Sequence, residues 1–412
     1  MLKKENNLIA WCNSQLVIRK TSFMTFFIFM MFATQSILQW PLLMYWNMHS
    51  NNWGDLKIVL ELAECSKKIG LDIYKSGEMN NCGEYSFNYL YGRFLIYFIN
   101  ILHLRLIPLE IIGYFFLFIF SYCIASLWPK FNTFRLMEVL TLLLVIFSPI
   151  SMLLAERANF DILIIWLILI SLKKLHRDQE LVGLLLLCLA SLMKFYTIPL
   201  VLLYLLHAKK IRTRVLAIPM LILLVLSTFN DLQLISKQSV GIGADVESGY
   251  YQAFGFRAIV LDANFTKSVN LDGVGVWSFS LIVLILTMVL TLKSFNFHSM
   301  EEVNVEDISF VKSNLLHFYF FAVPFYIFFF FGSTEYRLIF LLLSFCALSK
   351  TDFYDSNITN TIYVLMLVAF WLTKPSGRLD IFGDMAIEVL VIMNLIYFLK
   401  NFSFLRNTLS KF

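Results

Sequence analysis

The sequence predicts an all-α, polytopic membrane protein with about 12 transmembrane helices. Of its 412 residues, 59% are hydrophobic, only 15% are charged and 42 are phenylalanine. The mean hydropathy is +0.74, whereas a water-soluble domain carries about 25% charged residues and few long apolar runs. Because apolar runs recur up to the C-terminus, we expect residues 1–412 to form a single integral membrane domain.

Twelve apolar runs are the candidates for membrane helices. They span residues 22–45, 106–127, 136–155, 160–172, 181–193, 197–208, 214–231, 273–293, 314–332, 337–349, 358–373 and 384–400. Several central runs hold about 13 residues and reach only about 20 Å as helices, less than the ~30 Å of the hydrocarbon core. Such short runs favour broken or re-entrant helices around a cavity, where irregular backbone is tolerated.

Basic residues indicate the orientation of the predicted membrane domain. Three short connections are rich in lysine and arginine, at residues 130–135, 173–177 and 209–214. By the positive-inside rule these connections are cytoplasmic, and an even number of helices places both termini on that side. The opposite side then carries two long exterior loops, at about 46–90 and 232–272.

The first exterior loop contains an amphipathic stretch and two cysteines. Cys65 and Cys82 share this loop, while the other four cysteines lie in apolar runs or in the basic N-terminal segment. If the loop faces an oxidising compartment, a Cys65–Cys82 disulfide is favoured. Residues 89–104, which follow, are expected to form an interfacial helix, because basic side chains interrupt their apolar pattern.

Two classes of partner or ligand find no support in the composition. The net charge of +5 is the surplus expected from cytoplasmic loops of a membrane protein and does not indicate nucleic acid. The six histidines are scattered singly along the chain, so no metal site is predicted from their spacing.

The most informative polar stretch joins two apolar runs at residues 155–161. It contains Glu156, Arg157, Asn159 and Asp161. An ionisable group near the depth of the bilayer is costly unless it is paired or lines a water-filled cavity, so the stretch is a candidate functional site. In a continuous helix Arg157 and Asp161 would lie one turn apart and could pair. The alternative is a purely structural ion pair that orients the two helices.

Polar side chains at the ends of other apolar runs are expected to join this stretch on the exterior side. They are Asp55, Lys194, Tyr196, Glu335, Tyr336 and Arg337. The cations Arg157, Lys194 and Arg337 suit a phosphate or pyrophosphate head group. A nearby carboxylate could act as general base on an acceptor hydroxyl, and Asp55 is the candidate because the preceding Trp-Gly dipeptide permits a close approach.

Each of these residues has a structural alternative. Asp55 could cap a helix that starts at Leu56. Lys194 could be a lysine at a helix end that reaches back to the membrane surface. Glu335 and Arg337 could pair with each other at the tip of a loop.

Six short motifs follow one another along the chain in the order found in a known family. They are Gly54-Asp55-Leu56, Asp72-Ile73-Tyr74, Asn88-Tyr89, Glu156-Arg157-Ala158-Asn159-Phe160-Asp161, Lys194-Phe195-Tyr196 and Tyr336-Arg337-Leu338-Ile339-Phe340. The set resembles the GT-C superfamily of integral-membrane glycosyltransferases and, within it, family 87-like proteins of bacterial surface-polysaccharide synthesis. Three positions depart from the family pattern: Ala158 stands where glycine is frequent, and Leu90 and Thr197 stand where proline is frequent.

The resemblance implies transfer of a sugar from a polyprenyl-phosphate donor to a glycan or glycolipid acceptor, by an inverting displacement. The site would lie in a periplasm-facing cavity of a multi-pass protein in the bacterial inner (plasma) membrane, with both termini cytoplasmic. The product would belong to a surface polysaccharide such as the O-antigen of lipopolysaccharide. No cofactor is expected, since a lipid phosphate leaves readily, and a requirement for a divalent metal stays open.

The resemblance also implies roles for individual residues. Asp55 would be the general base, and Arg157, Lys194 and Arg337 would hold the donor phosphate, whose negative charge grows as the glycosidic bond breaks. The side chains that would position the sugar or these cations are Glu156, Asn159, Asp161, Tyr196, Glu335 and Tyr336.

Two other activities fit the same architecture. An O-antigen or related polysaccharide polymerase would use a pyrophosphate-linked repeat unit as its donor. A transporter or flippase for lipid-linked sugars would line a path with intramembrane charges, and it predicts an inverted internal repeat, which the hydropathy pattern does not show.

Overall fold

The chain folds almost entirely into helices in the part that the structure describes. The computed structural model describes residues 21–34, 53–69, 93–127, 146, 148–177, 179–208, 210–242, 253–254, 308–331, 333–334, 338–348, 361–362, 364–369, 386–387 and 389–398. Within these residues the predicted all-α class is confirmed. The exception is one antiparallel pair of two-residue strands, β1 (Ala253–Phe254) and β2 (Ser333–Thr334).

Most of the helices coincide with the predicted apolar runs. Their bounds are α3 (Gly54–Ile69), α5 (Arg93–Ile101), α6 (Leu109–Leu127), α8 (Pro149–Arg157), α9 (Asp161–His176), α10 (Glu180–Met193), α11 (Ile198–His207), α12 (Ile211–Ile242), α16 (Ile308–Phe331) and α17 (Ile339–Leu348). The 3₁₀ turns η1 (Leu104–Leu106) and η2 (Phe195–Thr197) join α5 to α6 and α10 to α11. Further helical segments cover Thr21–Thr34 and Val389–Phe398.

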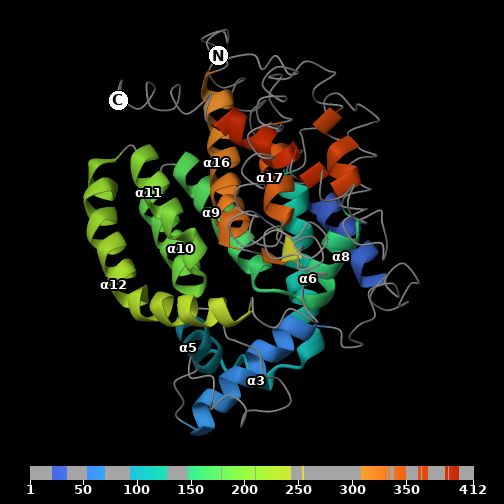
Figure 1. Cartoon of the computed structure of the whole chain (residues 1–412), viewed down its shortest axis with the longest axis vertical. Helices are drawn as coiled ribbons and strands as arrows, with labels where there is room; N and C mark the ends of the chain where they lie inside the picture. Colours follow the sequence, from blue (N-terminus) through green and yellow to red (C-terminus); the bar gives the residue numbers. More distant parts are fainter. Residues whose placement is uncertain are drawn as a thin grey trace, which may run out of the picture.

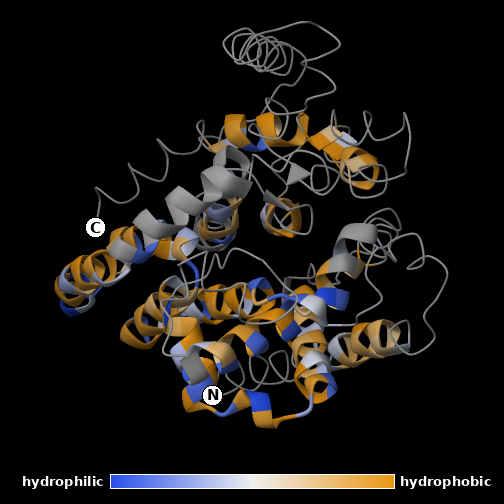
Figure 2. Cartoon of the chain, turned by 60° about the horizontal axis from the view of Figure 1, so that its bottom comes forward, coloured by the Kyte–Doolittle hydropathy of each residue, from blue (hydrophilic) through white to orange (hydrophobic). Residues whose placement is uncertain are grey.

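Two of the described helices are long and apolar enough to cross a membrane. Their apolar windows are Leu109–Ser126 in α6 and Ile211–Phe229 in α12. Large apolar side chains are exposed on both helices, such as Phe115 on α6 and Leu226 on α12. Figure 2 shows that most of the described chain is hydrophobic. These features support membrane association of the chain. The full set of about 12 helices remains a prediction, and the run at 273–293 lies outside the described residues.

The helices pack as a bundle with a further layer at one end (Figure 1). α9 packs against α6 and α10, both α10 and α11 pack against α12, and α16 packs against α17. α3 and α5 pack against each other at the bottom of Figure 1, where α3 runs across the end of the bundle. A hydrogen bond from the Trp53 N–H to the Glu156 carbonyl oxygen (2.7 Å) fixes the start of α3 to the end of α8.

Helix boundaries refine the predicted topology. α12 continues to Ile242, so the exterior loop predicted at 232–272 begins with about three helical turns. α5 has nine residues and is about 14 Å long, too short to cross a membrane, as expected for an interfacial helix. The β1–β2 pair joins two segments that were both predicted on the exterior side.

Candidate active site

The polar stretch at residues 155–161 forms a break between two helices. α8 ends at Arg157, and Ala158 then adopts the left-handed conformation (φ 46°, ψ 47°). α9 starts only at Asp161. The segment is therefore not one continuous helix, and Arg157 and Asp161, which could have paired in such a helix, have different partners.

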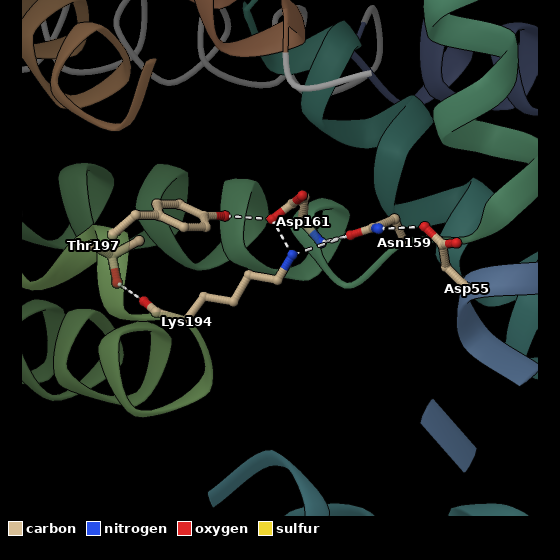
Figure 3. A network of polar contacts seen from close by, with 6 residues as sticks. Asp55, Asn159, Asp161, Lys194 and Thr197 are labelled. Carbon is tan, nitrogen blue, oxygen red and sulfur yellow. Dashed lines mark hydrogen bonds and ion pairs between the residues drawn. The ribbon is translucent and has the colours of Figure 1, made fainter. Parts of the chain in front are cut away.

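Two ion pairs from distant parts of the chain meet at this break. In the outer pair, Arg157 Nη1 lies 3.1 Å from Oδ1 of Asp55, in the first turn of α3. In the inner pair, Lys194 Nζ, directly after α10, lies 2.6 Å from Asp161 Oδ1. Figure 3 shows Asn159 between Asp55 of the outer pair and the inner pair, so that these polar side chains form one connected row.

The amide of Asn159 connects the two ion pairs in a fixed orientation. Its Oδ1 accepts hydrogen bonds from the backbone N–H of Asp161 (2.8 Å) and from Lys194 Nζ (3.3 Å). A backbone N–H can only donate, so the amide nitrogen of Asn159 must face the other way. There it donates to Asp55 Oδ2 at 2.5 Å. Asn159 therefore couples the position of the Asp55 carboxylate to that of the inner pair.

The two ion pairs differ in their exposure to solvent. The side chains of Asp161 and Lys194 are 0% and 4% exposed, whereas those of Asp55 and Arg157 are 15% and 28% exposed. Tyr196 Oη also donates to Asp161 Oδ1 (2.5 Å), and the start of α9 favours a negative charge at Asp161. The inner pair is thus enclosed by protein, while the outer pair can meet a ligand.

These contacts decide against two of the structural alternatives. α3 begins at Gly54, so Asp55 lies inside its first turn, and the Asp55 carboxylate accepts hydrogen bonds from Arg157 and Asn159. This differs from the cap of a helix that starts at Leu56. Lys194 is buried against Asp161 and does not reach towards the surface.

The backbone of Lys194 is held by residues that the sequence interpretation did not assign to the site. Lys194 is extended (φ −142°, ψ 120°), and its carbonyl oxygen accepts from Thr197 Oγ1 at 2.9 Å. The same Oγ1 lies 2.9 Å from Ser191 Oγ in the last turn of α10. A threonine a few residues after the end of a helix is a signal for such a turn, because its hydroxyl can bond to nearby backbone, here to the carbonyl three residues earlier. Thr197 thus shapes the turn where the family pattern has proline.

A close approach of α6 places Trp53, and through it Asp55. Trp53 is 4% exposed, and its backbone has φ +69°. Its indole ring packs edge to face on Tyr114, with ring centroids 5.5 Å apart. A Cβ atom added at Gly113 would lie 2.4 Å from Trp53 Cδ2. Glycine at position 113 is therefore needed for the indole to reach its place.

We expect Gly113→Ala to lower the free energy of unfolding by about 1–3 kcal/mol, the usual effect of overpacking, and to displace Asp55. Thermal unfolding of the detergent-solubilised protein measures this. Gly54→Ala is the matched control, since nothing lies within 4 Å of its added Cβ atom, and it should be nearly neutral. Equal stability of the two variants would contradict the described contact.

We also expect Ala158→Val to be more harmful than Ala155→Val. Both alanines are buried, at 0% and 4% exposure, but only Ala158 has a positive φ. A β-branched residue in the left-handed region is a strained outlier, so the two variants should differ by about 1–2 kcal/mol in stability. Chemical unfolding measures the difference. Ala158→Gly, which suits this conformation, should keep the protein folded.

Several predicted residues lie outside the described residues or have a partial role. Glu335, Tyr336, Arg337 and Cys82 are in the first group. Directly after Arg337 the chain enters the site region, because Phe340 in α17 packs edge to face on Tyr196, with ring centroids 5.7 Å apart. Glu156 contributes its backbone carbonyl, which binds Trp53. Cys65 is disulfide-bonded, and its pairing with Cys82 stays a prediction.

The described residues contain no group of three or more histidine, cysteine, aspartate or glutamate side chains arranged to hold a metal ion. Comparison with protein families, curated proteins and solved structures gives no match to this chain.

Proposed function

We propose that the chain is a membrane glycosyltransferase that moves a sugar from a polyprenyl-phosphate donor to a lipid-linked or surface-glycan acceptor. One observation carries this proposal: Asp55 and Lys194, from separate segments, both bond to the amide of Asn159, and Arg157 pairs with the same Asp55. The sequence motifs select the same residues as the base and the phosphate ligands. The apolar helices α6 and α12 support a setting in which a lipid-linked donor is at hand.

The exposures support different roles for the two cations. In the described part of the chain, Arg157 contacts Asp55 through Nη1 alone. The Arg157 side chain is 28% exposed, and its guanidinium has five N–H donors. The N–H groups that do not contact Asp55 can therefore form a bidentate contact with a phosphate. Lys194 is enclosed by Asp161 and Asn159. We assign the direct phosphate contact to Arg157. Lys194 positions Asn159, and its positive charge also favours a phosphate nearby.

In the proposed reaction Asp55 accepts the proton of an acceptor hydroxyl. The acceptor oxygen forms a bond to the anomeric carbon of the donor sugar, from the face opposite the phosphate. The bond from that carbon to the phosphate oxygen breaks, and polyprenyl phosphate leaves with the electron pair. Arg157 stabilises the charge that grows on the phosphate, and the configuration of the anomeric carbon is inverted.

Structural analysis of the surface polysaccharide from a strain lacking the gene tests this proposal in the cell. The expected result is the loss of one glycosidic residue, restored by the wild-type gene and not by Asp55→Asn. Chains that stop at a single intact repeat unit would identify a polymerase instead. Loss of the same residue with lipid-linked sugar retained on the cytoplasmic side would favour a flippase, and an unchanged polysaccharide would contradict a role in its synthesis.

A further inference from the structure

A second polar cluster lies at the other end of α9. Lys173 Nζ lies 2.9 Å from Tyr122 Oη and 3.3 Å from Ser126 Oγ, both near the end of α6. The ammonium also lies 4.7 Å from the centroid of the Tyr122 ring. Lys173 comes twelve residues after Asp161, roughly 18 Å further along a helix. This lysine cluster of Lys173, Tyr122 and Ser126 is therefore separate from the candidate active site.

Lys173 carries a positive charge without a carboxylate partner in the part of the chain that is described. Its contacts there are the two hydroxyls and the tyrosine ring. Arg93, by contrast, pairs with Asp231 at 3.0 Å, and the neighbouring Lys174 donates to Gln179 Oε1 at 2.6 Å. A half-buried ammonium that lacks a counter-charge favours an anion at its remaining N–H.

The two hydroxyls bring further donors to the same place. Buried serines elsewhere in the described helices, namely Ser121 in α6 itself, Ser191 and Ser344, each donate to a carbonyl oxygen one turn earlier. Ser126 and Tyr122 accept from the lysine and donate to no group among the described residues. The two hydroxyl hydrogens and the third ammonium hydrogen thus belong to groups that lie within 3.3 Å of the same Lys173 Nζ, and such a donor set suits the oxygens of a phosphate.

We propose that the lysine cluster binds the phosphate group of an anionic glycerophospholipid. Ser126 is the last residue of the apolar window of α6, so the cluster lies where a membrane helix leaves the hydrocarbon and meets the head groups. Lys174 and Arg177 follow Lys173 and disfavour a zwitterionic choline head group. The inference takes only the membrane setting and the cytoplasmic side from the proposed function, and none of its chemistry.

Native mass spectrometry of the purified full chain, titrated with phosphatidylglycerol or phosphatidylcholine, tests this site. We expect the first phosphatidylglycerol to bind in preference to phosphatidylcholine. Lys173→Met should weaken it about tenfold, the effect of losing one charge-assisted hydrogen bond. Tyr122→Phe and Ser126→Ala should each weaken it about threefold, since each removes one neutral donor without changing the net charge.

Lys174→Met is the matched control, because it removes the same charge from the next residue and leaves the cluster intact. An equal loss in Lys173→Met and Lys174→Met would show diffuse electrostatic attraction and overturn the proposal. If excess inorganic phosphate abolishes binding and the two lipids bind equally, the site binds free phosphate, and the proposal is overturned as well. Asp55→Asn should bind lipid like the wild type, so a failure of the proposed transferase activity stays distinguishable from a failure of this site.

Discussion

Asp55→Asn is expected to lower kcat for sugar transfer by roughly a hundred to ten thousand fold, the usual contribution of a positioned general base. The substitution keeps the shape of the side chain but removes its capacity to take a proton. Arg157 loses its partner, but it is 28% exposed, so the protein should stay folded. Steady-state turnover of a polyprenyl-phosphate sugar, measured beside a thermal unfolding curve, gives both quantities.

Glu61→Gln is the matched control for this variant. Glu61 also lies on α3, but its side chain is 43% exposed and forms a surface pair with Lys57 at 3.7 Å. Its loss should leave turnover unchanged and stability within about 0.5 kcal/mol. Full turnover in Asp55→Asn would remove Asp55 from the role of base and leave the outer pair as a structural contact.

Lys194→Met is expected to lower the free energy of unfolding by about 3–5 kcal/mol, the effect of breaking a buried ion pair. Asp161 is 0% exposed, so without Lys194 its carboxylate is left as a buried charge with reduced compensation. The Asn159 amide also loses one of its donors, which loosens its hold on Asp55. Chemical unfolding in detergent measures the change in stability.

A double-mutant cycle separates the pair from its surroundings. Lys194→Met combined with Asp161→Asn removes both charges, so the double variant should be more stable than Lys194→Met alone. Lys57→Met, at a surface pair, should be nearly neutral. A double variant no more stable than Lys194→Met would contradict the inner pair as the source of the effect.

The residues of the site could be selected from the sequence because the predicted membrane topology places them on the same side. Asn159 and Lys194 stand at the ends of apolar runs and Asp55 lies in the exterior loop that follows the first run, and such positions on one side of a membrane can meet. The partners within the site were not predictable, because the Arg157–Asp161 pair was considered only for a continuous helix, and the positive φ of Ala158 that ends the helix is a property of the folded backbone. Glycine at that position would have signalled it.

The bridging role of Asn159 could not be predicted, since its contact with Asp55 joins residues that are 104 positions apart and depends on tertiary packing. The length of α12 was underestimated for a different reason. Hydropathy detects only the apolar part of a helix. α12 continues beyond its apolar window, from Phe229 to Ile242, with more polar residues. Apolar runs therefore located the helices better than they located the helix ends.

The central claim is that this site breaks a bond between a sugar and a lipid phosphate. The most direct test is to incubate the purified protein in proteoliposomes with a polyprenyl-phosphate sugar and an acceptor lipid, and to identify the lipids by mass spectrometry. We expect release of polyprenyl phosphate and a glycosylated acceptor with inverted anomeric configuration, both absent with Asp55→Asn. Intact donor that crosses the membrane without cleavage would contradict the account and assign the buried charges to transport.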